Sequence, residues 1–185
     1  HGDSIVADPA YTKVPFNWAT EFHNIFGGDK SSLANDTSGF DIVIGNPPYV
    51  RQEFLSPIKP ALQKDYQEFY NGTADLYTYF YRRGFQLLKK DGYLGFSASS
   101  TCTKTSSGAN LRRFLKNETA IDRFVDFVDL QIFEDATNYP CIVVARNTKP
   151  ALDHKVQFAE VESLPGLETE NLLEKASHVK VAQNS

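Results

Sequence analysis

The stretch from Phe40 to Val50 reads FDIVIGNPPYV, and it decides how the rest of the chain is interpreted. Its first six residues, 40–45, form a short apolar run that predicts a buried strand. Asn46-Pro47-Pro48-Tyr49 follows at once. It predicts a rigid corner at the carboxyl end of that strand, which is where ligands of open α/β sheets lie.

This corner suits the binding of a planar –NH2 group. The side-chain oxygen of Asn46 and the carbonyl of Pro47 can accept from its two N–H groups, which favours a pyramidal nitrogen with a localised lone pair. Proline fixes φ and has no N–H, and it holds the preceding residue extended, so Pro47 and Pro48 aim both oxygens at one point. Tyr49 offers a flat face to the ring that carries the amine. A plain strand-ending turn is the alternative reading.

Composition limits the remaining interpretations. The chain has 185 residues, 41% of them hydrophobic, which suffices for one domain with a core. No apolar run is long enough to span a membrane. The net charge of −4 indicates that contacts to a phosphate backbone lie largely outside this chain. Cys102 and Cys141 are isolated, and we interpret them as free buried thiols of a cytoplasmic protein. Because the sequence contains no Met, we expect an internal piece of a longer protein.

Hydrophobic patterns predict an α/β fold with the order β–α–β–α–β–β. The expected strands are 40–45, 93–98, 121–128 and 141–145, and the expected helices are 74–90 and a second one around 111–115. Two final strands without an intervening helix predict an antiparallel pair at the edge of the sheet. Gly92 is expected to cap the first helix in a left-handed conformation.

The flanking segments are less regular. Aromatic spacing predicts a short amphipathic helix within 16–26. Residues 50–73 predict either a lid loop or a partly helical connector. Beyond 150 we expect a strand at 155–160, a short helix around 172–173 and frayed last residues.

Four segments together resemble amino-directed DNA methyltransferases of the type IIG, Eco57I-like restriction–modification family. FDIVIGNPPYV resembles the catalytic NPPY motif. ADLYTYFYRRGFQLLKKDGYLGF, beginning at Ala74, resembles the helix and strand that follow it. FEDATNYPCIVVARN, beginning at Phe133, resembles the last hairpin, and PFNWATEFHNIF, beginning at Pro15, is similar to the segment before the catalytic strand.

The resemblance implies a partial class I, Rossmann-like S-adenosylmethionine-dependent methyltransferase fold, namely the second half of the sheet with an antiparallel terminal hairpin. It also implies methylation of adenine N6 in a base flipped out of double-stranded DNA. By position, Asn46 and Pro47 would accept from the amine. The flipped base would contact Tyr49 and Phe133. The cofactor adenine would lie between Pro48 and Phe80, with Asp75 nearby; no metal is expected.

The resemblance also divides the chain. Residues 1–39 are expected to be a pre-catalytic segment, 40–147 the C-terminal half of the catalytic domain, and 148–185 an extension toward a target-recognition region. None of the 11 glycines forms a G-x-G pattern. We therefore expect most of the cofactor site upstream in the parent polypeptide, and an inactive isolated fragment.

Other interpretations of individual residues stay open. Phe80 and Phe133 suit core packing, and Asp75 suits a helix cap. Arg51 suits a phosphate contact or the surface, and we expect 82–83 to be a solvated face. The four histidines show neither metal nor triad spacing.

Other functions stay open as well. The motif also occurs in enzymes that methylate a protein glutamine amide or a guanine amine of ribosomal RNA. A non-catalytic module for DNA recognition or assembly is the alternative from another class.

Overall fold

The computed structural model describes residues 5–6, 10–11, 16–26, 38–128, 130, 139–161 and 177–183, with 177 and 178 described by backbone alone. The helices are α1 (Trp18–Glu21), α2 (His23–Phe26), α3 (Lys59–Tyr66), α4 (Leu76–Leu87), α5 (Thr101–Lys104) and α6 (Ala109–Glu118), with 3-10 turns η1 (Gln52–Leu55), η2 (Gln67–Phe69) and η3 (Ser106–Gly108). The strands are β1 (Phe40–Gly45), β2 (Leu88–Ser99), β3 (Ala120–Asp126), β4 (Pro140–Arg146), β5 (Lys155–Glu160) and β6 (Ser177–Ala182).

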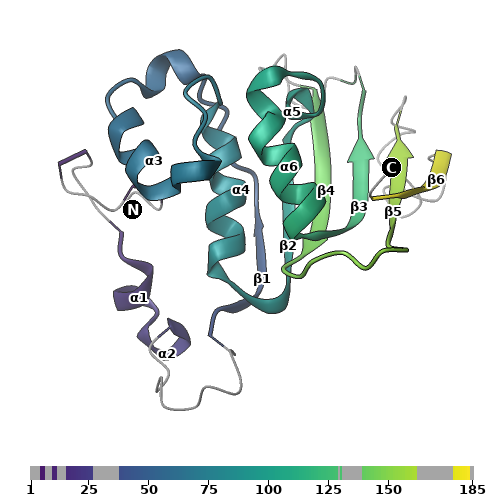
Figure 1. Cartoon of the computed structure of the whole chain (residues 1–185), viewed down its shortest axis with the longest axis horizontal. Helices are drawn as coiled ribbons and strands as arrows, with labels where there is room; N and C mark the ends of the chain where they lie inside the picture. Colours follow the sequence, from purple (N-terminus) through teal and green to yellow (C-terminus); the bar gives the residue numbers. More distant parts are fainter. Residues whose placement is uncertain are drawn as a thin grey trace.

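The strands form one six-stranded sheet in the order β1-β2-β4-β3-β5-β6. The β1/β2 and β3/β5 pairs are parallel and the other pairs are antiparallel. Figure 1 shows α4, α5 and α6 on one face of this sheet. The predicted antiparallel hairpin is confirmed as β3 and β4. Its predicted place at the edge is wrong, because β4 pairs with β2 and β5 and β6 extend the sheet beyond β3.

Strand β1 begins and ends where the sequence predicts, but it is not buried. Ile42 is 63% exposed and Ile44 is 79% exposed. Among the described residues β1 has one strand neighbour, β2, and the pair Gly45↔Phe96 fixes its register. Only the side of β1 that carries Val43 packs against the main core. The apolar run therefore predicted the strand correctly, but the prediction that this strand is buried is wrong.

Helix α4 is shorter than predicted, because the chain leaves it at Leu87 and enters β2 directly. Gly92 lies inside the strand, and Asp91 takes the positive φ of 62°. A Cβ on Gly92 would approach the Phe40 carbonyl oxygen to 2.9 Å, so this glycine permits close pairing with β1. The predicted left-handed cap at Gly92 is wrong.

The segments around the sheet are more ordered than their composition indicated. Residues 50–73 form the partly helical connector, with α3 between η1 and η2. The predicted helix within 16–26 is split into α1 and α2. Trp18 of α1, Phe22 between the two helices and Phe26 of α2 surround Phe40 at ring distances of 6.1, 5.2 and 5.4 Å. The predicted helix around 172–173 lies outside the described residues.

The predicted strand at 155–160 is confirmed as β5, and β6 pairs along the whole of it. The predicted fraying is wrong as far as Gln183, and residues 184–185 lie outside the described part of the chain. Gln183, which follows β6, is 8% exposed. Its Nε2 donates to the carbonyls of Leu115 (3.0 Å) and Lys116 (3.1 Å) and also to that of Thr119, and its Oε1 accepts from the amide of Ile121 at 2.9 Å. One side chain thus joins the end of β6 to the end of α6.

Both cysteines are free and buried, as predicted. Burial raises the pKa of Cys102 to about 11 and raises that of Cys141 further. Within the part of the chain that the structure describes, no helix is long and apolar enough to cross a membrane.

Candidate active site

The motif Asn46–Tyr49 leaves the carboxyl end of β1 and is fastened to the start of α4. The amide of Leu76 donates to the carbonyl of Val50 at 3.0 Å, and the amide of Gln52 donates to Asp75 Oδ1 at 3.0 Å. The chain beyond the motif is therefore held at two consecutive points. This fixes the direction in which the motif projects from the sheet.

The two predicted acceptors differ in exposure, because Asn46 is exposed and Pro47 is buried. No described residue donates to the Asn46 side chain or to the carbonyl of Pro47. The amide of Val50 donates at 3.1 Å to the next carbonyl, that of Pro48. The local turn therefore uses the carbonyl oxygen of Pro48, and it does not use the Asn46 side-chain oxygen or the Pro47 carbonyl oxygen.

Tyr49 is half-buried, and its ring lies 6.2 Å from that of Tyr77 at an angle of 50°. Its hydroxyl is buried and has no hydrogen-bond partner among the described residues. Burial, and after it the proximity of Cys141, raises the pKa of Tyr49. The Tyr77 hydroxyl lies 3.3 Å from Thr101 Oγ1, which lies 2.9 Å from Ser99 Oγ. Tyr77 of α4 thus packs beside the Tyr49 ring, and the Tyr77 hydroxyl is in turn within hydrogen-bond distance of Thr101.

A pocket of about 210 Å³ lies under the motif, and we call it the motif pocket. It brings together four predicted site residues, Asn46, Pro47, Pro48 and Phe80. Tyr49 and Asp75 do not line it. The remaining wall consists of Trp18, Val43, Ile44, Gly45, Arg83, Gly84, Leu87 and Phe96. Most of these side chains are apolar, so the pocket suits a flat, weakly polar ring.

Phe80 packs against the main core, as the core-packing interpretation predicted, and it also lines the motif pocket. Asp75 occupies the N-cap position of α4 but makes no side-chain cap bond. Its carboxylate accepts from Gln52 instead. Asp75 is thus the N-cap residue, as the helix-cap interpretation predicted, but its side chain does not make the cap hydrogen bond. Phe133 lies outside the described residues.

The two arginines of α4 do not form the solvated face that the sequence predicted. Arg83 lines the motif pocket, and its Nε is buried. Arg82 holds its guanidinium carbon 4.8 Å from the centre of the Phe114 ring. Sequence reasoning missed Arg83, although its position three residues after Phe80 places both on one side of a helix.

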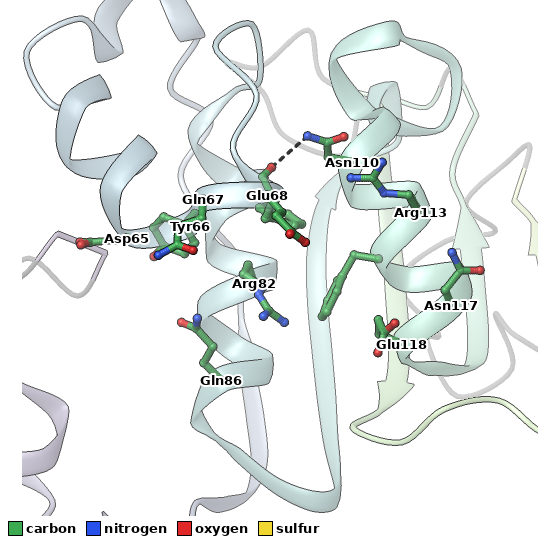
Figure 2. A pocket seen from close by; sticks show the side chains of 12 residues that line it. Asp65, Tyr66, Gln67, Glu68, Arg82, Gln86, Asn110, Arg113, Asn117 and Glu118 are labelled. Carbon is green, nitrogen blue, oxygen red and sulfur yellow. Dashed lines mark hydrogen bonds between the residues drawn. The ribbon is translucent and has the colours of Figure 1, made fainter.

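A second, polar pocket lies between α4 and α6, and we call it the polar groove (Figure 2). Its volume is about 450 Å³, and no predicted site residue lines it. Asn110 Nδ2 donates across it to the carbonyls of Phe69 (3.2 Å) and Tyr70 (3.0 Å). Arg82 projects into this groove. The two adjacent arginines of α4 thus line different pockets.

Among the described residues no group of three or more His, Cys, Asp or Glu side chains could hold a metal ion.

Solved structures show the same fold at low sequence identity. A structure described as a class I S-adenosylmethionine-dependent methyltransferase from Listeria monocytogenes has a TM-score of 0.53 and 20% identity, over 71% of this chain and 38% of that one. The type IIL restriction-modification enzyme MmeI in complex with DNA has a TM-score of 0.57 and 15% identity, over 80% of this chain and 19% of that one. The predicted fold class is confirmed as part of the class I methyltransferase fold.

Curated relatives are more similar in sequence. The type II methyltransferase M.XhoI of Xanthomonas vasicola is 39% identical over 112 residues, which are 60% of this chain and 20% of that protein. The type II restriction enzyme and methyltransferase RM.Eco57I of Escherichia coli is 33% identical over 107 residues, 56% of this chain and 11% of that protein. The type II methyltransferase M.BstVI of Geobacillus stearothermophilus is 39% identical over 143 residues, 74% of this chain and 25% of that protein.

The chain thus spans between 11% and 25% of the length of these three relatives. A family match covers residues 3–133, which is more than half of the chain and includes β1, the motif and α4. The family that the motif predicted is confirmed: this chain belongs to the Eco57I restriction-modification methylase family.

Proposed function

We propose that the protein that carries this chain transfers the methyl group of S-adenosylmethionine to the N6 amine of an adenine flipped out of double-stranded DNA. It would act within a restriction–modification or phage-defence system. One observation carries the proposal. The Asn46 side chain and the Pro47 carbonyl have no donor among the described residues, and they stand at the carboxyl end of β1 beside an apolar pocket.

The two oxygens address the main difficulty of the reaction. The lone pair of an exocyclic amine is delocalised into its ring, which makes the nitrogen a poor nucleophile. Acceptors on both N–H groups favour the pyramidal nitrogen that attacks. Asn46 and Pro47 provide these acceptors without adding a backbone donor at Pro47 or Pro48.

The motif pocket fits one part of S-adenosylmethionine, its adenine ring. Pro48 and Phe80 line the pocket and would contact the ring faces. When bound, this cofactor supplies an activated methyl group on a sulfonium. No described carboxylate lines the motif pocket, so contacts to the ribose hydroxyls and to the methionine end would come from other parts of the protein. Asp75 does not line the pocket, although its carboxylate can accept further hydrogen bonds beside the one from Gln52.

The flipped base would contact Tyr49, whose ring is held from behind by Tyr77. Phe133 would contact the same base. Stacking on an aromatic ring accepts any base. The amine contacts at Asn46 and Pro47 would admit only bases with an exocyclic amine, and the choice of adenine over cytosine follows from the resemblance of the motif. DNA sequence recognition would come from the region beyond residue 148, following the predicted division of the chain. Two buried free thiols accord with a reducing compartment such as the cytoplasm.

The proposal is tested by digesting DNA to nucleosides after incubation with the full-length protein and S-adenosylmethionine. We expect N6-methyldeoxyadenosine, identified by its mass and its chromatographic retention time. N4-methyldeoxycytidine would contradict the adenine assignment. Absence of any modified nucleoside would favour the non-catalytic alternative.

A further inference from the structure

The far end of the sheet from the motif has an apolar surface. Figure 1 shows β5 and β6 beyond α6, with no described helix over them. A groove of about 450 Å³ lies between α6 and this part of the sheet, and we call it the apolar groove. The rings of Phe124 and Phe158 stack in it at 5.8 Å and 19°, and Val181 is 42% exposed. Its floor consists of side chains from β3, β5 and β6, namely Ile121, Phe124, Val156, Phe158 and Val181.

The charged side chains that line the apolar groove are basic. Arg112 and Lys116 lie one turn apart on α6, and no described carboxylate lines the groove with them. The whole chain has a net charge of −4, so the sign of the charge is reversed locally. An apolar floor beside basic side chains complements a partner surface that is apolar and acidic.

One part of the Arg112 guanidinium is bonded and the other part is not. Its Nη1 donates to the carbonyls of Cys102 and Thr105 at the end of α5, which hold the group in place. Its Nε and Nη2 have no hydrogen-bond partner among the described residues, and neither atom is buried. No described carboxylate forms an ion pair with this arginine.

The edge formed by Nε and Nη2 is the one that binds a carboxylate through two parallel hydrogen bonds. Arg146 uses it in this way in the same chain, donating from Nε and Nη2 to the two oxygens of Asp122 at 3.0 and 3.2 Å. In Arg112 the same edge is accessible and unpaired. Arg112 therefore offers a positioned site for a carboxylate at the wall of the apolar groove.

We propose that the apolar groove docks a segment of the full-length polypeptide from outside residues 1–185, which places apolar side chains on the floor and a carboxylate on the free edge of Arg112. The chain spans only 11% to 25% of the three relatives compared above, so proteins of this family have ample chain to supply such a segment. A DNA phosphate could also bind Arg112, but protein–DNA interfaces are polar and the floor of this groove is not. The inference does not depend on the methyl-transfer reaction.

The experiment measures how fast a maleimide labels the thiol introduced by Val181→Cys in the full-length protein, with the labelled peptide identified by mass spectrometry. We expect at least tenfold slower labelling than at Leu152→Cys, a position that is 96% exposed and lies outside the groove. Adding Arg112→Lys should speed labelling at position 181 roughly tenfold or more, because a hydrogen bond with a charged partner is lost. Arg113→Lys, on the same helix but lining the polar groove (Figure 2), should change the rate less than about twofold.

Cys102 separates docking from a purely structural role of Arg112. This thiol lies on α5 and is 6% exposed. A lysine at position 112 can still donate to the carbonyls at the end of α5, so Cys102 should stay unlabelled in Arg112→Lys. Labelling of Cys102 together with the introduced thiol would mean that Arg112 only holds α5 in place, and would overturn the inference.

Three other outcomes would also overturn it. Rapid labelling of Val181→Cys without a second substitution would show that the groove is open in the full-length protein. Protection that requires added DNA would assign the Arg112 edge to a phosphate. Finally, p-benzoylphenylalanine in place of Val181 should cross-link within one polypeptide to a peptide that contains Asp or Glu and lies outside residues 1–185, and a cross-link within 1–185 or to a second copy would contradict the proposed occupant.

Discussion

Asn46 combines exposure with a fixed position, because the residues after the motif are fastened to α4. Replacing it with Ala removes one preoriented acceptor. We expect the activation free energy of methylation to rise by about 3 kcal/mol, and kcat to fall accordingly, by analogy with single oxyanion-hole donors. The dissociation constant of S-adenosylhomocysteine should stay within about twofold, because the cofactor ring is gripped by other residues.

Single-turnover methylation and titration calorimetry of the full-length protein measure the two effects. Asn117→Ala, at an exposed position on α6, is the control. Near-normal turnover in Asn46→Ala would contradict the role of this residue.

Tyr49 separates the role of a ring from that of its hydroxyl. The hydroxyl is buried without a described partner, so Tyr49→Phe removes an unpaired polar group. We expect the free energy of unfolding in urea to stay the same or to rise by about 1 kcal/mol, and activity to be near normal. Tyr49→Ala removes the stacking face and should weaken base flipping by roughly 1–3 kcal/mol. Fluorescence of 2-aminopurine at the target position reports flipping, and a tenfold loss of activity in Tyr49→Phe would contradict stacking as its main role.

At the residue scale the sequence predicted the types of side chain better than their directions. The prolines of the motif restrict their own backbone, and Asn46 is exposed and lines the motif pocket. Asp75 bonds to Gln52, and Arg83 bonds to the carbonyl of Ile5, because contacts between α4 and residues distant in sequence decide both orientations. Residue type at a given spacing carries no information on those distant partners.

Among the elements, the turn before α6 tolerates the least change. A Cβ on Gly108 would lie 2.2 Å from the Cys102 carbonyl oxygen and 2.6 Å from the Cys102 Cα, both backbone atoms. Gly108→Ala is therefore expected to lower the free energy of unfolding by roughly 1–3 kcal/mol through overpacking. Gly72→Ala is the control, since its Cβ would meet nothing closer than 3.4 Å. Urea denaturation measures both, and equal stabilities would contradict the close approach.

Strands were easier to predict than their order. Alternating or apolar runs mark β1 to β5 because each strand needs only local residues to be recognised. The insertion of β4 between β2 and β3 depends on pairing across the whole chain, which no local pattern contains. Strand β6 was missed because its sequence, SHVKVA, contains two β-branched residues, Val179 and Val181, which make too short a pattern to mark a strand. Both side chains are exposed in the structure.

For the whole molecule, the buried thiols predict instability in alkali. The pKa of Cys102 rises from 9.0 to about 11 in the folded protein, because burial disfavours the thiolate. Above pH 9 the unfolded chain loses this proton while the folded chain keeps it, so stability should fall as the pH rises toward 11. Urea midpoints measured between pH 8 and 11 test this, with a shallower decline expected for Cys102→Ala. An unchanged midpoint would contradict the burial of these groups.

The described site also predicts what the 185-residue chain does alone. Among the described residues, the lining of the motif pocket offers contacts for a ring and no carboxylate. We expect the purified chain to bind S-adenosylmethionine far more weakly than micromolar and to leave DNA unmethylated. Titration calorimetry provides the measurement, and a micromolar dissociation constant would show that this chain holds most of the cofactor site. The exposed Ile42 and Ile44 on β1 also predict self-association, which sedimentation would detect.

Gln183 has a mechanical consequence. Its side chain bonds to three carbonyls at the end of α6 and to the amide of Ile121 at the start of β3. A pulling force applied after Gln183 would load these bonds before it reached the ladder between β5 and β6. The side-chain amide of Gln183 thus anchors the end of β6, and a force applied to the chain at this point would be transmitted through that amide to α6.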